Sequence, residues 1–180
     1  ELNLSCPNVD GGTRFATDPA ALAEVVSACR VVTRKPMWAK LSPNVGSIVP
    51  LAQAAEEAGA DALTVSNTYL GLLVDWRARK PQLGRGFGGV SGKGIRPLAL
   101  RLVYETSQAV EIPVVASGGA SCAQDVLDFL VVGASAVQIG TAAFRTPDLL
   151  SRIAQELRRL LREDGATIQA LVGSLEWPSL

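Results

Sequence analysis

The chain has 180 residues, of which 48% are hydrophobic, and its 17 basic and 17 acidic side chains give a formal net charge of zero. This length is sufficient for one domain with a sizeable core. The balanced charge gives no electrostatic reason to expect nucleic acid or an anionic membrane surface as a partner, and no apolar stretch approaches the roughly 20 residues that span a bilayer. We therefore expect a single domain, with neither nucleic acid nor a membrane as its partner.

Cysteine and histidine usage narrows the chemistry further. Cys6, Cys29 and Cys122 cannot all pair and show no metal-ligand spacing, which predicts a reducing, cytoplasmic setting and no metal site. Cys29 and Cys122 are interpreted as structural. Histidine is absent, so proton transfer near neutral pH requires a carboxylate, a lysine, a tyrosine or a perturbed thiol.

Five short apolar runs predict buried strands. Their apolar residues are continuous rather than alternating, which is typical of parallel strands covered on both faces. The predicted strands are 2–5, 36–41, 62–67, 113–117 and 136–140.

A helical pattern follows each predicted strand. Asp18 before Pro19 predicts a capped helix start, and Ser121-Cys122-Ala123-Gln124 reads as a capping box. Helices near 48–58 and 122–132 end at Gly59 and Gly133, where glycine supplies a left-handed cap.

The repeated βα order predicts a parallel α/β fold, either an open sheet or a barrel. Polar and glycine residues follow all five strands, which favours a (β/α)₈ barrel, because an open sheet concentrates its chemistry at one switch point. A complete barrel needs eight such units and typically about 250 residues. We therefore expect residues 1–180 to be the C-terminal portion of a single barrel domain, and expect these residues alone to be poorly soluble or inactive.

The segment 68–95 is too long for an ordinary connection between a strand and a helix. Loops of that length in compact domains are usually functional, so we expect a functional loop here.

Glycines close the last two predicted strands, at Gly118-Gly119 and at Gly140-Thr141. In barrels these two loops often hold a phosphate, because glycine lets backbone N–H groups approach it. Gly92, in the stretch GGVSGKG, adds a third set of donors. The alternative is that these glycines only turn the chain.

Two further groups suggest a ligand at the same strand ends. Lys40 lies in the apolar run PMWAKL and needs a negative partner there, such as an anionic cofactor ring or a substrate carboxylate; otherwise it is a surface lysine. Uncharged amide and hydroxyl groups suit a planar ligand with amide and carbonyl edges, although asparagine is also common in turns. These residues are Asn3, Asn8, Asn67 and Thr68.

Cys6 ends the first predicted strand, within LNLSCPNVDGGT. It is either a small buried hydrophobic residue or a thiol that acts as acid or base.

Several of these stretches together resemble one family. ELNLSCPN, SNTYLG, RKPQLG, GGVSGKGIRP, VVASGGASCAQDVLDFL and AVQIGTA are similar to the class 1 dihydroorotate dehydrogenases, and the middle segment is most similar to the NAD-linked class 1B catalytic subunit. The resemblance covers essentially the whole chain. It implies a (β/α)₈ barrel that holds FMN and oxidises dihydroorotate to orotate in de novo pyrimidine biosynthesis.

The resemblance also implies roles for individual residues. Cys6 matches the catalytic base, and Asn3, Asn8, Asn67 and Thr68 match substrate contacts. Ser66 stands where an aliphatic residue against the flavin is expected. The implied cofactor contacts are Asn3, Lys40, Ser66, Gly92, Gly118, Gly119, Gly140 and Thr141.

Class 1B enzymes imply an oligomer in which a second subunit carries FAD and an iron–sulfur cluster. The scattered cysteines of this chain cannot supply the usual four thiolates of such a cluster. Two alternatives stay open. One is another FMN-dependent barrel oxidoreductase; the other is a non-catalytic, barrel-derived binding subunit, which a flavin-free purified protein would favour.

Overall fold

A five-stranded parallel sheet forms the centre of the computed structural model, which describes residues 1–5 and 12–178. All five predicted strands are confirmed, and each is shorter than predicted. In sheet order the strands are β1 (Leu2–Asn3), β2 (Trp38–Lys40), β3 (Ala62–Val65), β8 (Val114–Ser117) and β9 (Ala136–Gln138).

The register places the strand ends side by side. Asn3 pairs with Lys40, and Lys40 with Thr64. Ser117 pairs with Gln138 at the other side of the sheet. Because all four pairings are parallel, the residues that follow the strands emerge at one edge.

The two faces of the sheet differ in chemistry. The face against the helices is apolar, with Ala39, Leu63 and Val65 buried in the main core. Several of the alternate residues, which face the other way, are polar. They include Asn3, Lys40, Thr64, Ser117 and Gln138.

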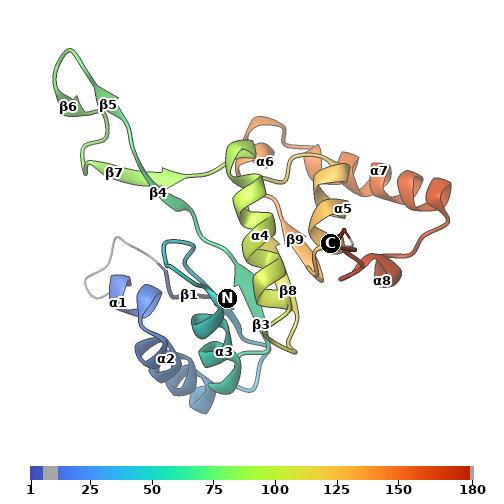
Figure 1. Cartoon of the computed structure of the whole chain (residues 1–180), viewed down its shortest axis with the longest axis horizontal. Coiled ribbons are helices and arrows are strands. Elements are labelled where there is room, and N and C mark those ends of the chain that lie inside the picture. The colour runs from blue at the N-terminus through green and yellow to red at the C-terminus, as the bar shows by residue number, and fades with distance from the viewer. Residues whose placement is uncertain (6–11, 179–180) are drawn as a thin grey trace.

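Helices α1 to α5 pack in chain order, each on the next, and α5 then packs on α7 and α8 (Figure 1). No helix in the described part of the chain is long and apolar enough to span a membrane. The helices are α1 (Gly12–Thr17), α2 (Pro19–Val32), α3 (Val49–Glu57), α4 (Arg96–Ser107, preceded by the 3₁₀ turn η1, Lys93–Ile95), α5 (Ala123–Val131), α6 (Thr141–Arg145), α7 (Leu149–Asp164) and α8 (Ile168–Leu171).

Local signals explain most helix ends. The Asp18 side chain accepts hydrogen bonds from the N–H groups of Ala20 and Ala21, which confirms the predicted cap of α2. Gly59 and Gly133 follow α3 and α5 with φ values of +98° and +110°, as the predicted left-handed caps require.

The predicted capping box at Ser121 is wrong. Cys122 is the N-cap of α5 and makes no side-chain cap hydrogen bond. The side chain that bonds back to Ser121 is Asp125 instead of Gln124. Its carboxylate accepts hydrogen bonds from both the N–H and the hydroxyl of Ser121. A carboxylate at the third helical position is the stronger acceptor, so it determines the geometry of this helix start.

The segment 68–95, which was predicted as a functional loop, contains regular secondary structure. It folds into two antiparallel ladders that project from the sheet as an arm (Figure 1). β4 (Tyr69–Leu72) pairs with β7 (Phe87–Val90), and β5 (Val74–Asp75) with β6 (Lys80–Pro81). The arm then leads into η1 and α4.

Two valines of α2 test the assignment of its buried face. Val26 is 0% exposed and Val31 is 86% exposed, so the same truncation removes packed methyl groups at one site and solvated ones at the other. In the complete gene product containing this chain, we expect Val26→Ala to lower the free energy of unfolding by about 2 kcal/mol and Val31→Ala by less than about 0.5 kcal/mol. Denaturant unfolding measures both values, and equal losses would contradict the packing.

Candidate functional site

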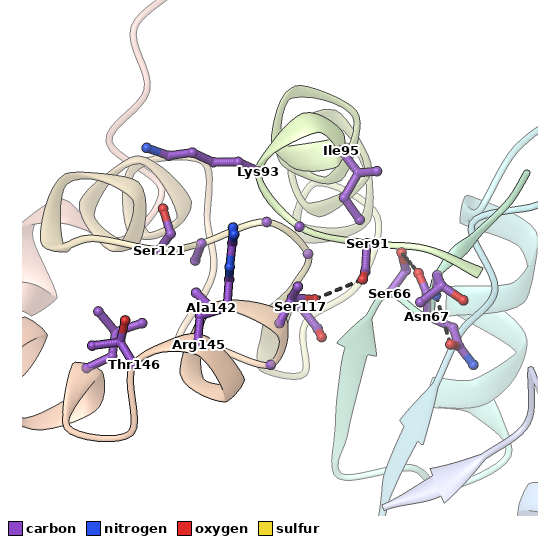
Figure 2. Close-up of a pocket in the computed structure, with 18 of the residues that line it drawn as sticks. Ser66, Asn67, Ser91, Lys93, Ile95, Ser117, Ser121, Ala142, Arg145 and Thr146 are labelled. Carbon is purple, nitrogen blue, oxygen red and sulfur yellow. Dashed lines mark hydrogen bonds between the residues drawn. The ribbon is translucent and has the colours of Figure 1, made fainter. Parts of the chain in front are cut away.

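A pocket of about 550 Å³ opens at the carboxyl ends of the strands (Figure 2). Its walls come from β2, from the residues that follow β3, β8 and β9, and from the residues between β7 and α4. Nine residues predicted from the sequence line it. They are Lys40, Ser66, Asn67, Thr68, Gly92, Gly118, Gly119, Gly140 and Thr141.

The other predicted site residues are placed differently. Asn3 does not line the pocket but hydrogen-bonds to Asn67, which does. Cys6 and Asn8 lie outside the described residues. Cys29 packs at the edge of the main core, in agreement with a structural role.

The pocket carries an excess of positive charge. Lys40, Lys93 and Arg145 contribute to its lining, and no aspartate or glutamate does so within residues 1–5 and 12–178. Three cations and no acid give a formal charge of +3, although the whole chain has a net charge of zero. Such a pocket favours an anionic ligand.

Glycine loops form another part of the pocket wall. Gly119 has φ +86°, and a Cβ atom there would lie 2.9 Å from the Gly92 carbonyl oxygen and from the Arg96 nitrogen. The two loops therefore pack backbone against backbone, which only glycine allows. In the described part of the chain, the N–H groups of Gly119 and Ala120 donate to no protein acceptor. These free donors can hold the oxygens of an anion.

Asp125 holds the loop that contains Gly118 and Gly119 in place through Ser121, which follows it. Its carboxylate accepts from Ser121 at 2.8 and 2.9 Å and lies 2.5 Å from Nη1 of Arg96, which also reaches Asp128 at 2.7 Å. Burial acts to raise the pKa of Asp125, but the hydrogen bonds from Ser121 and the charge of Arg96 outweigh it and lower the pKa. The carboxylate is therefore ionised and ties α5 to α4.

Lys40 has a partner that the sequence did not suggest. Its Nζ lies 3.4 Å from Oε1 of Glu1, while Oε2 of Glu1 accepts from Thr64 at 2.6 Å and from Gln138 at 2.8 Å. Burial acts to raise the pKa of Glu1, yet the hydrogen bonds from Thr64 and Gln138 and the charge of Lys40 lower it overall. Lys40 is thus held in place by a carboxylate while it lines the pocket.

An amide cluster occupies the next part of the strand edge. Nδ2 of Asn67 donates to Oδ1 of Asn3 at 3.2 Å and lies 2.7 Å from Oγ of Ser5, while Oδ1 of Asn67 accepts from the N–H of Thr68 at 2.8 Å. The predicted Asn3–Asn67–Thr68 neighbourhood is therefore present. Ser5 belongs to it and was not predicted.

Asn44 is another residue that sequence reasoning missed. Its Nδ2 donates to the Thr68 carbonyl at 3.1 Å, and its Oδ1 accepts from the Leu70 N–H at 2.8 Å. It thereby holds the start of the arm against the segment after β2. The stretch SPN, which follows β2, was the available signal, because asparagine after proline often bonds to a neighbouring backbone.

A positively charged pocket at the carboxyl edge of a parallel sheet with alternating helices is the arrangement typical of enzymes of the (β/α)₈ barrel class. The sequence matches the dihydroorotate dehydrogenase family over residues 1–161. The chain belongs to this family, as the motifs predicted.

Individual relatives of similar sequence are also named dihydroorotate dehydrogenases. A Pelobacter propionicus protein named dihydroorotate dehydrogenase B (NAD(+)), catalytic subunit, is 51% identical over 178 residues, which are 98% of this chain and 59% of that protein. A Solibacter usitatus relative, 50% identical over 179 residues (98% of this chain, 59% of that protein), carries the A (fumarate) designation instead. The chain thus spans about three-fifths of the length of these curated relatives.

A solved structure supports the barrel. The dihydroorotate dehydrogenase of Eimeria tenella, determined in complex with ferulenol, superposes with a TM-score of 0.77 at 25% identity and covers 96% of this chain and 52% of its own. The predicted barrel fold class is confirmed.

The ionised state of Asp125 has a measurable consequence. Because its pKa is below the ordinary value of 3.8 in the folded chain, its contribution to stability is present above that value and is lost as the pH falls through the folded pKa. We expect Asp125→Asn to cost about 3 kcal/mol at pH 7, and the cost to shrink below about pH 4.

The matched control is Asp148→Asn, which removes an exposed pair with Arg152. We expect it to cost less than about 1 kcal/mol at either pH. Denaturant midpoints of the complete gene product across the pH range measure both costs. A pH-independent cost for Asp125→Asn would contradict the ionised pair.

Proposed function

We propose that this chain forms the cofactor- and substrate-binding part of an FMN-dependent dihydroorotate dehydrogenase, which oxidises dihydroorotate to orotate in de novo pyrimidine biosynthesis. The observation that carries the proposal is the pocket itself. It combines cations, free glycine-loop donors and an adjoining amide cluster, in a chain about half identical to proteins named for this activity.

The described residues fit a flavin nucleotide. The backbone donors around Gly119 suit a phosphate, and the close backbone packing there leaves no room for side chains that would cover it. Lys40, held by Glu1, supplies a fixed positive charge at the end of β2. FMN, when bound, supplies the two-electron acceptor for the oxidation.

The presence of a polar residue at position 66, where an aliphatic one was expected, is explained by a hydrogen bond within the chain. Ser66 is buried, and its hydroxyl donates to the carbonyl oxygen of Asn67 at 3.1 Å. Since this donor is satisfied internally, a polar residue at this position carries no uncompensated hydrogen-bonding group into the pocket.

The substrate role falls to the amide cluster. Asn67 and Asn3 present donor and acceptor groups that match the amide and carbonyl edges of a dihydropyrimidine ring. In this proposal Asn8 helps to hold dihydroorotate, and Cys6 takes a proton from one ring carbon while hydride leaves the adjacent carbon. Loss of that proton and that hydride creates the carbon–carbon double bond of orotate.

We extend the proposal to the electron acceptor, NAD(+), and to the assembly of the enzyme from two kinds of subunit. Several relatives are named catalytic subunits of an NAD(+)-linked enzyme, including a Bacillus pumilus protein that is 47% identical. We propose an oligomer with a second subunit that carries FAD and an iron–sulfur cluster, located in the cytoplasm. The exposed apolar side chains of the arm offer a surface for assembly. They include Leu70, Leu72, Leu73, Val74, Trp76 and Phe87.

Anaerobic titration of the complete gene product tests the function. Purified protein is expected to contain FMN, and stoichiometric dihydroorotate is expected to bleach the flavin absorbance while orotate appears. A flavin-free protein would favour a non-catalytic binding subunit. An FMN-loaded protein that dihydroorotate does not reduce would favour a different substrate.

The cysteine base has its own test. A free thiol has a pKa near 8.5, so we expect the rate of flavin reduction to rise through mildly alkaline pH. Cys6→Ser is expected to lower that rate at pH 7 by at least about 100-fold, because a serine hydroxyl is a far poorer base. Stopped-flow measurement of bleaching gives the rate. Full activity of the serine variant at pH 7 would rule out the assignment of Cys6 as the base.

A further inference from the structure

Arg145 is the last residue of α6, and its side chain extends from that helix into the pocket (Figure 2). The sequence pattern suggested no role for it, because a basic residue in the last turn of a helix is common at a solvated helix end. In the structure the Arg145 side chain is exposed to solvent and also lines the pocket, where a ligand can reach it. It shares the pocket wall with Ser121, Thr141 and Thr146.

The Arg145 guanidinium has no counter-ion within the described part of the chain. No hydrogen bond or ion pair of its side chain is present there. The acidic side chains of α5 are already engaged, since Asp125 and Asp128 both pair with Arg96. Lys40, by contrast, has Glu1 as its partner. Arg145 is therefore a cation available for a ligand.

The groups around Arg145 specify the chemistry of that ligand. Free N–H groups of Gly119 and Ala120 can bond to anion oxygens, but backbone groups bring no net charge. A phosphate monoester carries a charge of about −1.5 to −2 at pH 7. A guanidinium supplies the missing positive charge and can donate two parallel hydrogen bonds to such a group.

We propose that Arg145 binds the phosphate of the flavin nucleotide and makes the pocket select FMN over riboflavin, which has no phosphate. This inference rests on the proposed function, because it takes the flavin as the ligand. It adds a specificity-determining guanidinium to the backbone donors of the glycine loops. The conformation of α6 brings the guanidinium there, since Gly140 and Thr141 begin the same short helix.

Flavin titration of the stripped complete gene product tests the inference. Dissociation constants for FMN and for riboflavin are measured by flavin fluorescence for the wild type, Arg145→Gln and Arg145→Lys. Arg152→Gln is the matched control, because Arg152 is an exposed arginine that pairs with Asp148 and does not line the pocket. Thermal unfolding verifies that each variant is folded.

We expect Arg145→Gln to weaken FMN binding by about 10- to 100-fold and to leave riboflavin binding unchanged. Arg145→Lys is expected to recover part of the loss, because lysine retains the charge without the planar fork. Arg152→Gln is expected to change neither constant.

The outcomes separate the two proposals. Unchanged FMN binding in Arg145→Gln, or equal weakening of FMN and riboflavin, would overturn the role of Arg145 and leave the proposed function intact. A wild-type protein that binds neither flavin would overturn the proposed function as well.

Discussion

The parallel register of the sheet is the constraint on which the rest of the structure depends. Pairing of Asn3 with Lys40, and of Lys40 with Thr64, brings the ends of strands far apart in sequence to one edge. The polar face of these strands then allows Glu1 to bond to Lys40, Thr64 and Gln138 at once. A slip of one residue in any strand would turn these side chains into the apolar core, so the hydrophobic pattern that fixes the register also fixes the site.

Arg96 behind the pocket, and Lys40 and Arg145 in its lining, have different electrostatic environments. Arg96 forms ion pairs with Asp125 and Asp128. Asp125 also accepts a hydrogen bond from the N–H of Ser121, and so holds the loop that begins at Gly118. Lys40 is held by one carboxylate on the polar face of the sheet. Arg145 has no such partner within residues 1–5 and 12–178. The protein thus compensates the charges that support the fold and leaves positive charge where an anionic ligand is proposed to bind.

Sequence reasoning predicted the parts of the molecule that local chemistry determines. Continuous apolar runs identified the five strands, and Asp18, Gly59 and Gly133 marked helix ends through side-chain capping and positive φ. The arm was missed because its strands are short and exposed. The signal was Asp75, whose carboxylate accepts from the N–H groups of Arg77 and Ala78 and forms the turn of a hairpin. Glu1 and Arg145 were missed for a different reason: their roles depend on contacts between distant segments, which no local pattern reports.

The central claim is that the phosphate of a flavin nucleotide lies between the glycine loops and α6. A crystal structure of the complete gene product with bound FMN tests it most directly. The account predicts phosphate oxygens within hydrogen-bond distance of the Gly119 and Ala120 N–H groups and of the Arg145 guanidinium, with the ring extending towards Lys40. A phosphate bound elsewhere, or a flavin outside this pocket, would contradict it.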